Sequence, residues 1–229
     1  MIKPIIRWTI GPVRPDGFKC LRLSVNAIRQ LYDAELVICH NGLNNDQLEL
    51  LKTLDTKLVD QQECLSITEM PIGVAWKLYP TSLGSTHQLF IDNDLIITER
   101  IEAIDKFFQS DSTLMIHGSS RNYGRFDRHV PNQIEINSGL FGVPPDLNLG
   151  NLLDFYGSNW TENCLNSSRT WDEQGFIATA LSGYHHFNII DDISNCEKEL
   201  IRSAGMHFVG LNRALHHRPF KMYCNRFFL

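Results

Sequence analysis

The chain lacks the sequence features that would place it in several common protein classes. Its six cysteines include no Cys-x-x-Cys spacing, which favours reduced thiols over a disulfide framework or a structural zinc site. No apolar run approaches the roughly 18 residues of a transmembrane helix, and the start of the chain lacks the apolar core of a signal peptide. A formal net charge of -5 disfavours a nucleic-acid-binding surface. We therefore expect a cytoplasmic protein with no nucleic-acid partner.

Two nucleotide-binding motifs are also missing. No Gly-x-Gly-x-x-Gly follows the first strand-like segment, and no Gly-x-x-x-x-Gly-Lys-Ser/Thr occurs, so a dinucleotide-binding domain and a P-loop are both disfavoured. The composition is that of an ordinary globular protein, with 43% hydrophobic and 21% charged residues. A length of 229 residues suits one large domain better than two, and we expect a single domain over residues 1–229.

Strand-like and helix-like segments alternate along the first half of the chain. This alternation predicts βαβ units and an α/β fold, in which helices flank a mostly parallel central sheet. The expected strands cover residues 5–10, 35–39, 57–59, 88–91, 113–117, 134–143, 186–190 and 206–209. The expected helices cover residues 21–31, 44–54, 75–79, 101–108 and 147–156, with another that opens at residue 171.

The most informative motif is Asp92-Asn93-Asp94, which follows a short apolar run. On an extended strand end, side chains two residues apart point to the same side, so both carboxylates can converge on one cation. Mg²⁺ and Mn²⁺ prefer oxygen ligands and often bind through one or two carboxylates and the phosphates of a substrate. The carboxyl ends of the strands are also where open α/β sheets bind ligands. The alternative is a solvated loop whose acids cap the next helix.

A second motif, Asn137-Ser138-Gly139, interrupts an otherwise apolar strand. Such residues inside a strand indicate a bulge, or a ligand that approaches the backbone closely. The sequence favours neither explanation over the other.

The third and fourth motifs lie near the C-terminal end. Thr170 and Glu173 have the spacing of a capping box, which leaves Trp171 and Asp172 available for sugar binding at the mouth of a helix. For Glu173 capping is the simpler interpretation, and for Asp172 binding and a structural role are equally open. His207 lies in a short strand-like run before Gly210 and could reach over the edge of the sheet, although a lone histidine is more often a structural residue.

Taken in order, these four motifs resemble those of the GT-A glycosyltransferases, nearest the family of glycogenin and the lipopolysaccharide galactosyltransferases. In that family an Asp-x-Asp at a strand end and a later His-Phe-x-Gly segment hold Mn²⁺ on the diphosphate of a nucleotide sugar. The resemblance implies Asp92, Asp94 and His207 as ligands of Mn²⁺ or Mg²⁺. It implies donor contacts from Thr9, Lys77, Asp92, Asn93, Asn137 and Ser138, acceptor contacts from Trp171 and Asp172, and a catalytic role for Asp172 or Glu173.

Two segments depart from the family pattern. The family's Lys-Pro-Trp, whose lysine binds the diphosphate, is replaced by a segment in which Arg213 or Arg218 would have to serve, and we assign Arg213 to the donor site. The family's Asp-Gln-Asp reads Asp172-Glu173-Gln174 here.

The resemblance implies a metal-dependent hexosyltransferase that moves a sugar from a nucleoside-diphosphate sugar, a UDP-sugar in the first place, to a glycan or other hydroxyl acceptor. Retention of the anomeric configuration is favoured over inversion. Residues 1–112 would form the nucleotide-binding half, and residues 113–229 the sugar and acceptor half with the C-terminal tail. The aromatic, slightly basic tail at 220–229 is expected to dock on the domain and to make at most peripheral contact with a membrane.

Two alternatives use the same residues. In a phosphohydrolase of the haloacid dehalogenase type, Asp92 would be the nucleophile, Asp94 the acid and base, and Asp191-Asp192 a second acidic pair. A non-catalytic GT-A domain would bind the nucleotide sugar without transferring it.

Overall fold

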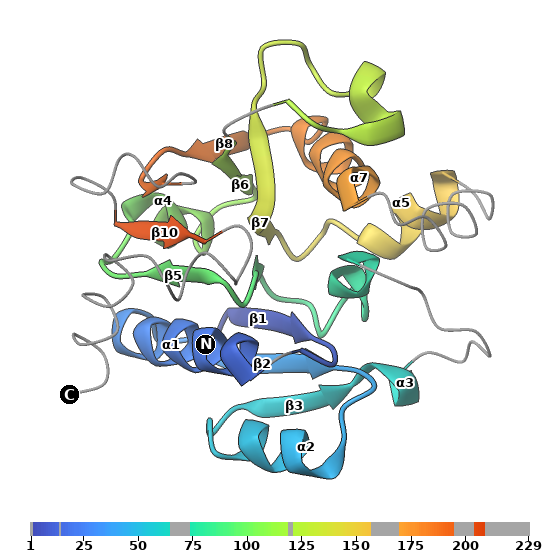
Figure 1. Ribbon diagram of the computed structural model, residues 1–229. Helices are drawn as coiled ribbons and strands as arrows, with labels where there is room; N and C mark the ends of the chain where they lie inside the picture. Colours follow the sequence, from blue (N-terminus) through green and yellow to red (C-terminus); the bar gives the residue numbers. More distant parts are fainter. Residues whose placement is uncertain are drawn as a thin grey trace.

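The computed structural model describes residues 2–13, 15–64, 74–118, 121–156, 170–194 and 204–208 (Figure 1). Its strands are β1 (Ile5–Ile10), β2 (Glu35–His40), β3 (Lys57–Asp60), β4 (Gln88–Ile91), β5 (Leu95–Ile97), β6 (Thr113–His117), β7 (Ile136–Val143), β8 (Phe187–Ile190), β9 (Ile193–Ser194) and β10 (Gly205–His207). Its helices are α1 (Pro15–Leu31), α2 (Asn45–Lys52), α3 (Gln61–Cys64), α4 (Glu102–Phe107), α5 (Leu149–Tyr156) and α7 (Thr170–Ser182), with 3₁₀ helices η1 (Val74–Leu78) and η2 (Gly124–His129).

A seven-stranded sheet in the order β3-β2-β1-β4-β7-β6-β8 forms the centre of the molecule. β1, β2, β3 and β4 are parallel neighbours, as are β6 and β8, while β7 runs antiparallel to both β4 and β6. The prediction of a mostly parallel α/β sheet flanked by helices is therefore confirmed. The strand order reverses at β1, which lies between β2 and β4, and this is the type of position where open α/β sheets bind ligands.

Alternation along the strands supplies two hydrophobic cores, one on each face of the sheet. Leu89 and Ile91 join the core that contains α1 side chains such as Leu21 and Val25. Phe90, between them in sequence, joins the opposite core with Phe176 of α7. The period of two residues in a strand is what divides the apolar side chains between the faces. In Figure 1 α1 lies beside β1 and β5, and α7 lies beside β7.

The structure corrects three details of the predicted elements. α1 begins at Pro15 and not at residue 21 as expected, and proline is well suited to a first helical position because its φ is already close to the helical value. The connection before β7 contains the 3₁₀ helix η2, which the polar composition of that segment did not predict. The apolar run around Asp92 is divided between two sheets, because β4 pairs in the central sheet and β5 in a small sheet of order β5-β10-β9.

Buried hydrogen bonds fasten α1 to the sheet. Trp8 Nε1 on β1 donates to Ser24 Oγ at 2.9 Å, and Ser24 Oγ donates to Leu95 O at 2.7 Å. Trp8, Ser24 and Leu95 are all fully buried.

Within the described ranges, no helix is both long enough and apolar enough to span a membrane.

Replacement of the Ser24 hydroxyl tests how much the stability of the fold depends on it. Ser24→Ala leaves the Trp8 N–H and the Leu95 carbonyl unpaired, so we expect the free energy of unfolding to fall by about 1–3 kcal/mol. Urea denaturation followed by tryptophan fluorescence measures this change. The control is Gln30→Ala on the exposed side of the same helix, which should change stability by less than about 0.5 kcal/mol. Equal stability of the two variants would contradict this role of Ser24.

Candidate functional site at the carboxyl end of β4

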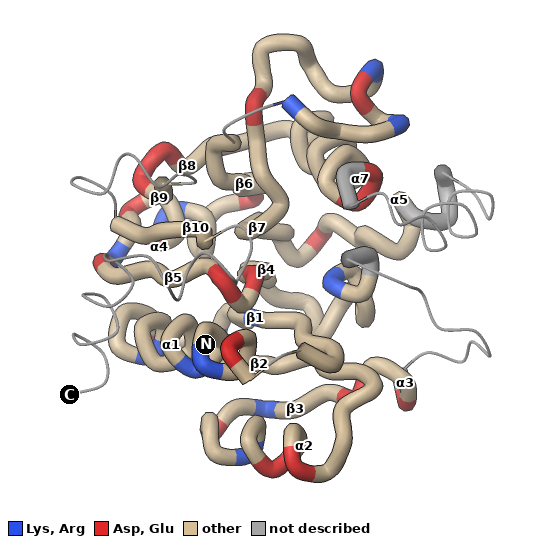
Figure 2. The backbone as a smooth tube through the Cα atoms, in the orientation of Figure 1, with Lys and Arg blue, Asp and Glu red and all other residues tan. Residues whose placement is uncertain are grey.

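Asp92 and Asp94 lie in a tight turn between β4 and β5. Leu95 N donates to Asp92 O at 3.1 Å, which closes the turn, and Asp92 N donates to Gly139 O of β7 at 2.8 Å. The prediction of an extended strand end was therefore wrong in its geometry, because the chain turns at Asn93. The predicted convergence of the two carboxylates is nevertheless present. Figure 2 shows acidic positions in this turn, in the middle of the molecule.

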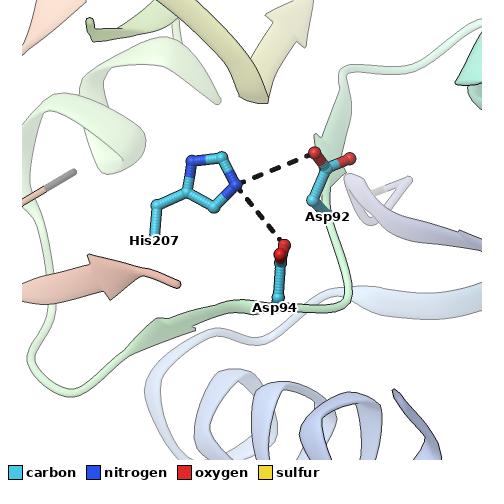
Figure 3. A group of neighbouring side chains, drawn as sticks. All are labelled: Asp92, Asp94 and His207. Carbon is cyan, nitrogen blue, oxygen red and sulfur yellow. Dashed lines mark ion pairs between the residues drawn. The ribbon is translucent and has the colours of Figure 1, made fainter. Parts of the chain in front are cut away.

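Strand pairing brings His207 to these carboxylates from a distant part of the chain. β10 runs antiparallel to β5 with His207 opposite Leu95, and Phe208 N donates to Asp94 O at 2.9 Å. His207 Nε2 lies 3.4 Å from Asp94 Oδ1 and 3.9 Å from Asp92 Oδ2 (Figure 3). One potential ligand atom from each of the three residues lies within 4.8 Å of the other two.

The Asn137-Ser138-Gly139 segment forms a bulge that makes room for this histidine. On β6, Met115 pairs with Phe141 while the next residue, Ile116, pairs with Asn137, so three residues of β7 are extra. A Cβ at position 139 would lie 2.3 Å from His207 Cε1, and only glycine leaves space for the ring. The bulge explanation is thus confirmed, and the bulge is also where an imidazole approaches the backbone.

Lys77 of η1 is the cation at the centre of the site. Its Nζ lies 2.9 Å from Asp92 Oδ1 and 3.3 Å from Glu173 Oε1, and it donates to Ser138 O at 3.2 Å. Burial by itself would lower the pKa of Lys77, but attraction to Asp92 and Glu173 outweighs it and raises the pKa above its usual value. Lys77 is therefore a fixed positive charge.

Glu173 points into the same cluster from α7. Its Oε2 accepts from Ser138 Oγ at 3.3 Å, and the side chain is only 5% exposed. Burial, with a smaller contribution from the charge of Asp92, raises the pKa of Glu173 to about 7 despite the opposing effect of Lys77. Because α7 begins at Thr170 itself and Glu173 contacts Ser138 and Lys77, capping is not the main role of this side chain.

Asp172 is directed to a different partner. Its Oδ1 accepts from Arg125 N and its Oδ2 from Arg125 Nε, both at 2.9 Å. Gly124, with a φ of +54°, fits against it, since a Cβ there would lie 2.0 Å from Asp172 Oδ1. This pairing fastens η2 to α7, so the expected catalytic or acceptor-binding role of Asp172 stays a prediction.

A pocket of about 520 Å³ opens beside the acidic turn. Its lining includes predicted donor-site residues and residues that the sequence did not single out, namely Thr9, Gly11, Pro12, Asn41, Trp76, Lys77, Asp92, Asn93 and Asp94. Asn41 comes directly after β2 and belongs to none of the four motifs. Its position after a strand of a parallel sheet was the available signal. Asn137 does not line this pocket, and its Oδ1 accepts from Gly139 N at 2.7 Å within the bulge.

Some predicted residues cannot be placed in this site. Arg213, Arg218 and the tail at 220–229 lie outside the described residues, as does the side chain of Trp171. Their expected roles stay predictions.

The ligand atoms of this cluster and their charge fit a divalent cation. Asp92 and Asp94 bring two carboxylates together beside His207, and partly buried like charges are expensive unless cations compensate them. Two carboxylates and an imidazole suit Mn²⁺ better than Mg²⁺, since Mg²⁺ prefers oxygen ligands alone. The short distances between Asp92, Asp94 and His207 would allow one ion to contact all three residues.

The chain has the GT-A fold of the glycosyltransferases, because its mixed α/β architecture matches solved structures with that fold. No protein-family model matches the sequence, and no curated protein matches it either. Solved structures do match, over 91–100% of the chain for the three described next.

Three matching structures are glycosyltransferases. The galactosyltransferase LgtC, solved with donor and acceptor sugar analogues, gives a TM-score of 0.62 at 11% identity, covering 97% of this chain and 95% of LgtC. GlyE of Streptococcus pneumoniae TIGR4 gives 0.61 at 9% identity, with 100% of this chain and 61% of GlyE covered. The bifunctional WbbM gives 0.62 at 8% identity, with 91% and 46% covered. The chain thus spans about three-fifths of GlyE and under half of WbbM, and these identities establish the fold alone.

The raised pKa of Glu173 predicts a pH-dependent stability that Glu173→Gln removes. The folded pKa of about 7 exceeds the ordinary glutamate value of 4.5, so the folded protein binds the proton more tightly than the unfolded chain. Stability from this group is present at low pH and is lost as the pH rises through the folded pKa. Relative to wild type, Glu173→Gln should gain about 1–3 kcal/mol between about pH 5 and pH 8.

Chemical denaturation at each pH, with EDTA in the buffer, measures this difference. Gln30→Ala provides the matched control, because the exposed amide has no ionisable group and its effect should not vary with pH. A stability difference between Glu173→Gln and wild type that is flat over this range would show that Glu173 ionises normally.

Proposed function

We propose that this protein is a metal-dependent glycosyltransferase, which moves a sugar from a nucleoside-diphosphate sugar to a hydroxyl group of a glycan or another acceptor. The observation that carries the proposal is the convergence of Asp92, Asp94 and His207, of which the two aspartates line the pocket. Two carboxylates and an imidazole at the carboxyl end of a parallel strand suit a cation that holds a diphosphate. The GT-A fold of the chain supports the same assignment.

In this proposal Asp92, Asp94 and His207 hold Mn²⁺ or Mg²⁺. When bound, the cation would act as a Lewis acid that offsets the charge of the departing diphosphate. Lys77, buried beside Asp92, adds a permanent positive charge near the same phosphates, where preorganised charge is most effective. Thr9 and Asn93 line the pocket in which the donor would lie, and UDP-sugars are the first donors to try.

The sugar and the acceptor are assigned to the other side of the cluster. Asn137 and Ser138 on the β7 bulge would bind the sugar, with Arg213 assigned to the diphosphate. Trp171 and Asp172 would bind the acceptor, and residues 113–229 would supply this half of the site while residues 1–112 supply most of the nucleotide pocket. The pairing of Asp172 with Arg125 gives Asp172 an orienting role for η2 as well.

Glu173 is the candidate catalytic residue. A carboxyl group whose pKa lies near 7 is suited to proton transfer at physiological pH. If the anomeric configuration is inverted, Glu173 would take the proton of the acceptor hydroxyl. If it is retained, which the resemblance favours, the leaving phosphate would take that proton, and Glu173 would contribute its charge to the site.

The geometry disfavours the phosphohydrolase alternative. Asp191 and Asp192 are exposed after β8, and three strand steps separate β8 from β4 in the sheet order. At about 4.8 Å a step, the second acidic pair lies roughly 14 Å from Asp92, too far to share one ion.

The first test is binding and turnover of nucleotide sugars. We expect isothermal titration calorimetry to detect binding of a nucleoside diphosphate in the presence of Mn²⁺ but not in EDTA. A sugar-transfer assay with a panel of acceptors should detect the glycosylated product. Nuclear magnetic resonance of that product reports retention or inversion. Tight donor binding without transfer or hydrolysis would favour the non-catalytic GT-A domain, and turnover of an aryl phosphate with Mg²⁺ would favour the phosphohydrolase.

The metal assignment has its own test. Asp94→Ala removes one of three ligands and should weaken Mn²⁺-dependent donor binding at least about tenfold. Asp191→Ala is the matched control, because Asp191 is an exposed aspartate at the end of another strand. Donor binding that is unchanged in Asp94→Ala, or weakened equally in Asp191→Ala, would exclude this site.

A further inference from the structure

Gln61 has an amide whose orientation is fixed by its neighbours. The side chain is fully buried at the start of α3, and its Nε2 donates to Trp76 O and to Tyr79 O, each at 2.7 Å. Both partners are backbone carbonyls, which only accept hydrogen bonds, so the NH₂ end of the amide must face them. Gln61 Oε1 is therefore directed to the opposite side.

Asn41 takes its orientation from Gln61 in turn. Asn41 Nδ2 donates to Gln61 Oε1 at 2.6 Å, and Asn41 N donates to Ile10 O at 3.1 Å. Because Gln61 Oε1 accepts only, Asn41 must turn its NH₂ toward it, and the Asn41 carbonyl oxygen must face the other way. The polarity of the Asn41 side chain is thus set by the two backbone carbonyls that bind Gln61.

The oxygen of Asn41 lies beside a glycine that lines the pocket. Asn41 and Gly11 both line the pocket, and a Cβ at position 11 would lie 3.1 Å from Asn41 Oδ1. Over the ranges described above, we find no donor bonded to this oxygen. Asn41 is 7% exposed, so a ligand that enters the pocket could satisfy this acceptor, whose polarity is fixed.

This acceptor and the acidic turn lie at two ends of one pocket. Asn41 follows β2 and Asp92 follows β4, with β1 between the two strands. Two strand spacings of about 4.8 Å separate them by roughly 10 Å. The base and the diphosphate are likewise the two ends of a nucleoside diphosphate, with the ribose between them.

We propose that Asn41 is a specificity-determining residue that selects the nucleobase of the donor. This inference rests on the proposed function, because it places a nucleotide in the pocket. Uracil and guanine carry a ring N–H at the centre of their Watson–Crick edge, which Asn41 Oδ1 accepts. Cytosine and adenine carry a lone pair there, and two acceptors that face each other in a confined pocket are both left unsatisfied. Gln61 is a positioning residue that acts through Asn41.

Calorimetric titration of UDP, CDP, GDP and ADP in Mn²⁺ tests the proposal. UDP is compared with CDP, and GDP with ADP. In the pair that binds, we expect the nucleotide whose base carries the ring N–H to have a dissociation constant at least about tenfold lower, because the other base leaves one hydrogen bond unsatisfied. Asn41→Ala should reduce the ratio of the two dissociation constants to within about threefold and retain Mn²⁺-dependent binding.

Two further variants separate positioning from general structural damage. Gln61→Met removes the amide that orients Asn41, so it should also lower the ratio, whereas a merely structural defect would weaken both nucleotides equally. Gly11→Ala places a methyl group against Asn41 Oδ1 and should weaken the favoured base more than its partner. Gln30→Ala on α1 is the control and should leave the ratio at its wild-type value.

Each contrary result has a defined meaning. Equal affinity for the two bases in wild type, or a ratio that Asn41→Ala leaves unchanged, would overturn the role of Asn41 while the proposed transferase stands. Failure of all four nucleotides to bind in Mn²⁺ would overturn the proposed function and this inference together.

Discussion

The buried ammonium of Lys77 is the interaction on which the site depends. It contacts Asp92 after β4, Ser138 in the β7 bulge and Glu173 on α7, and so joins η1 to three other elements. Without it, carboxylates from two of these elements would face one another across a low-dielectric gap, where repulsion between like charges is strong. A buried charge of this kind is stabilising only when its partners are all in place. The position of η1 therefore matters as much as the charge that it carries.

Departures from regular sheet geometry build the rest of the site. β4 and β5 are consecutive in sequence, but the turn between them transfers the chain from the central sheet to the small one. β5 then pairs with β10, and that pairing brings His207 to the carboxylates. The extra residues of the β7 bulge supply Gly139, whose missing side chain admits the imidazole ring. Regular strands would have placed none of these groups together.

What the sequence predicts well is local, and what it misses is long-range. Asp92 and Asp94 are recognisable because the apolar run before them is a strand whose end must be solvated or bound to a cation. The strands and helices follow from periodicity, with errors mainly at their ends, as at Pro15 of α1. The contact of His207 with Asp94 joins residues far apart in sequence and depends on the pairing of β10 with β5. Glu173 matched a local capping pattern, yet burial against Lys77 and Ser138 decides where its carboxylate lies. Asn41 belongs to no local motif, because its partner, Gln61, lies in another element.

The two ends of the pocket are connected through η1. Lys77 extends from this short helix to the acidic turn, while the carbonyl of Trp76, one residue earlier, accepts the hydrogen bond that orients Gln61 and through it Asn41. Arg7 of β1 holds the end of the same segment, since its two terminal nitrogens donate to Pro80 O at 2.6 Å and Tyr79 O at 2.7 Å, and its guanidinium lies over the Phe90 ring. Arg7 is buried at the centre of the sheet, so η1 is fastened to a rigid strand and not to a loop. A shift of η1 would therefore disturb the charge at one end of the pocket and the polarity at the other, because Lys77 supplies the charge and the neighbouring Trp76 carbonyl helps to orient Gln61.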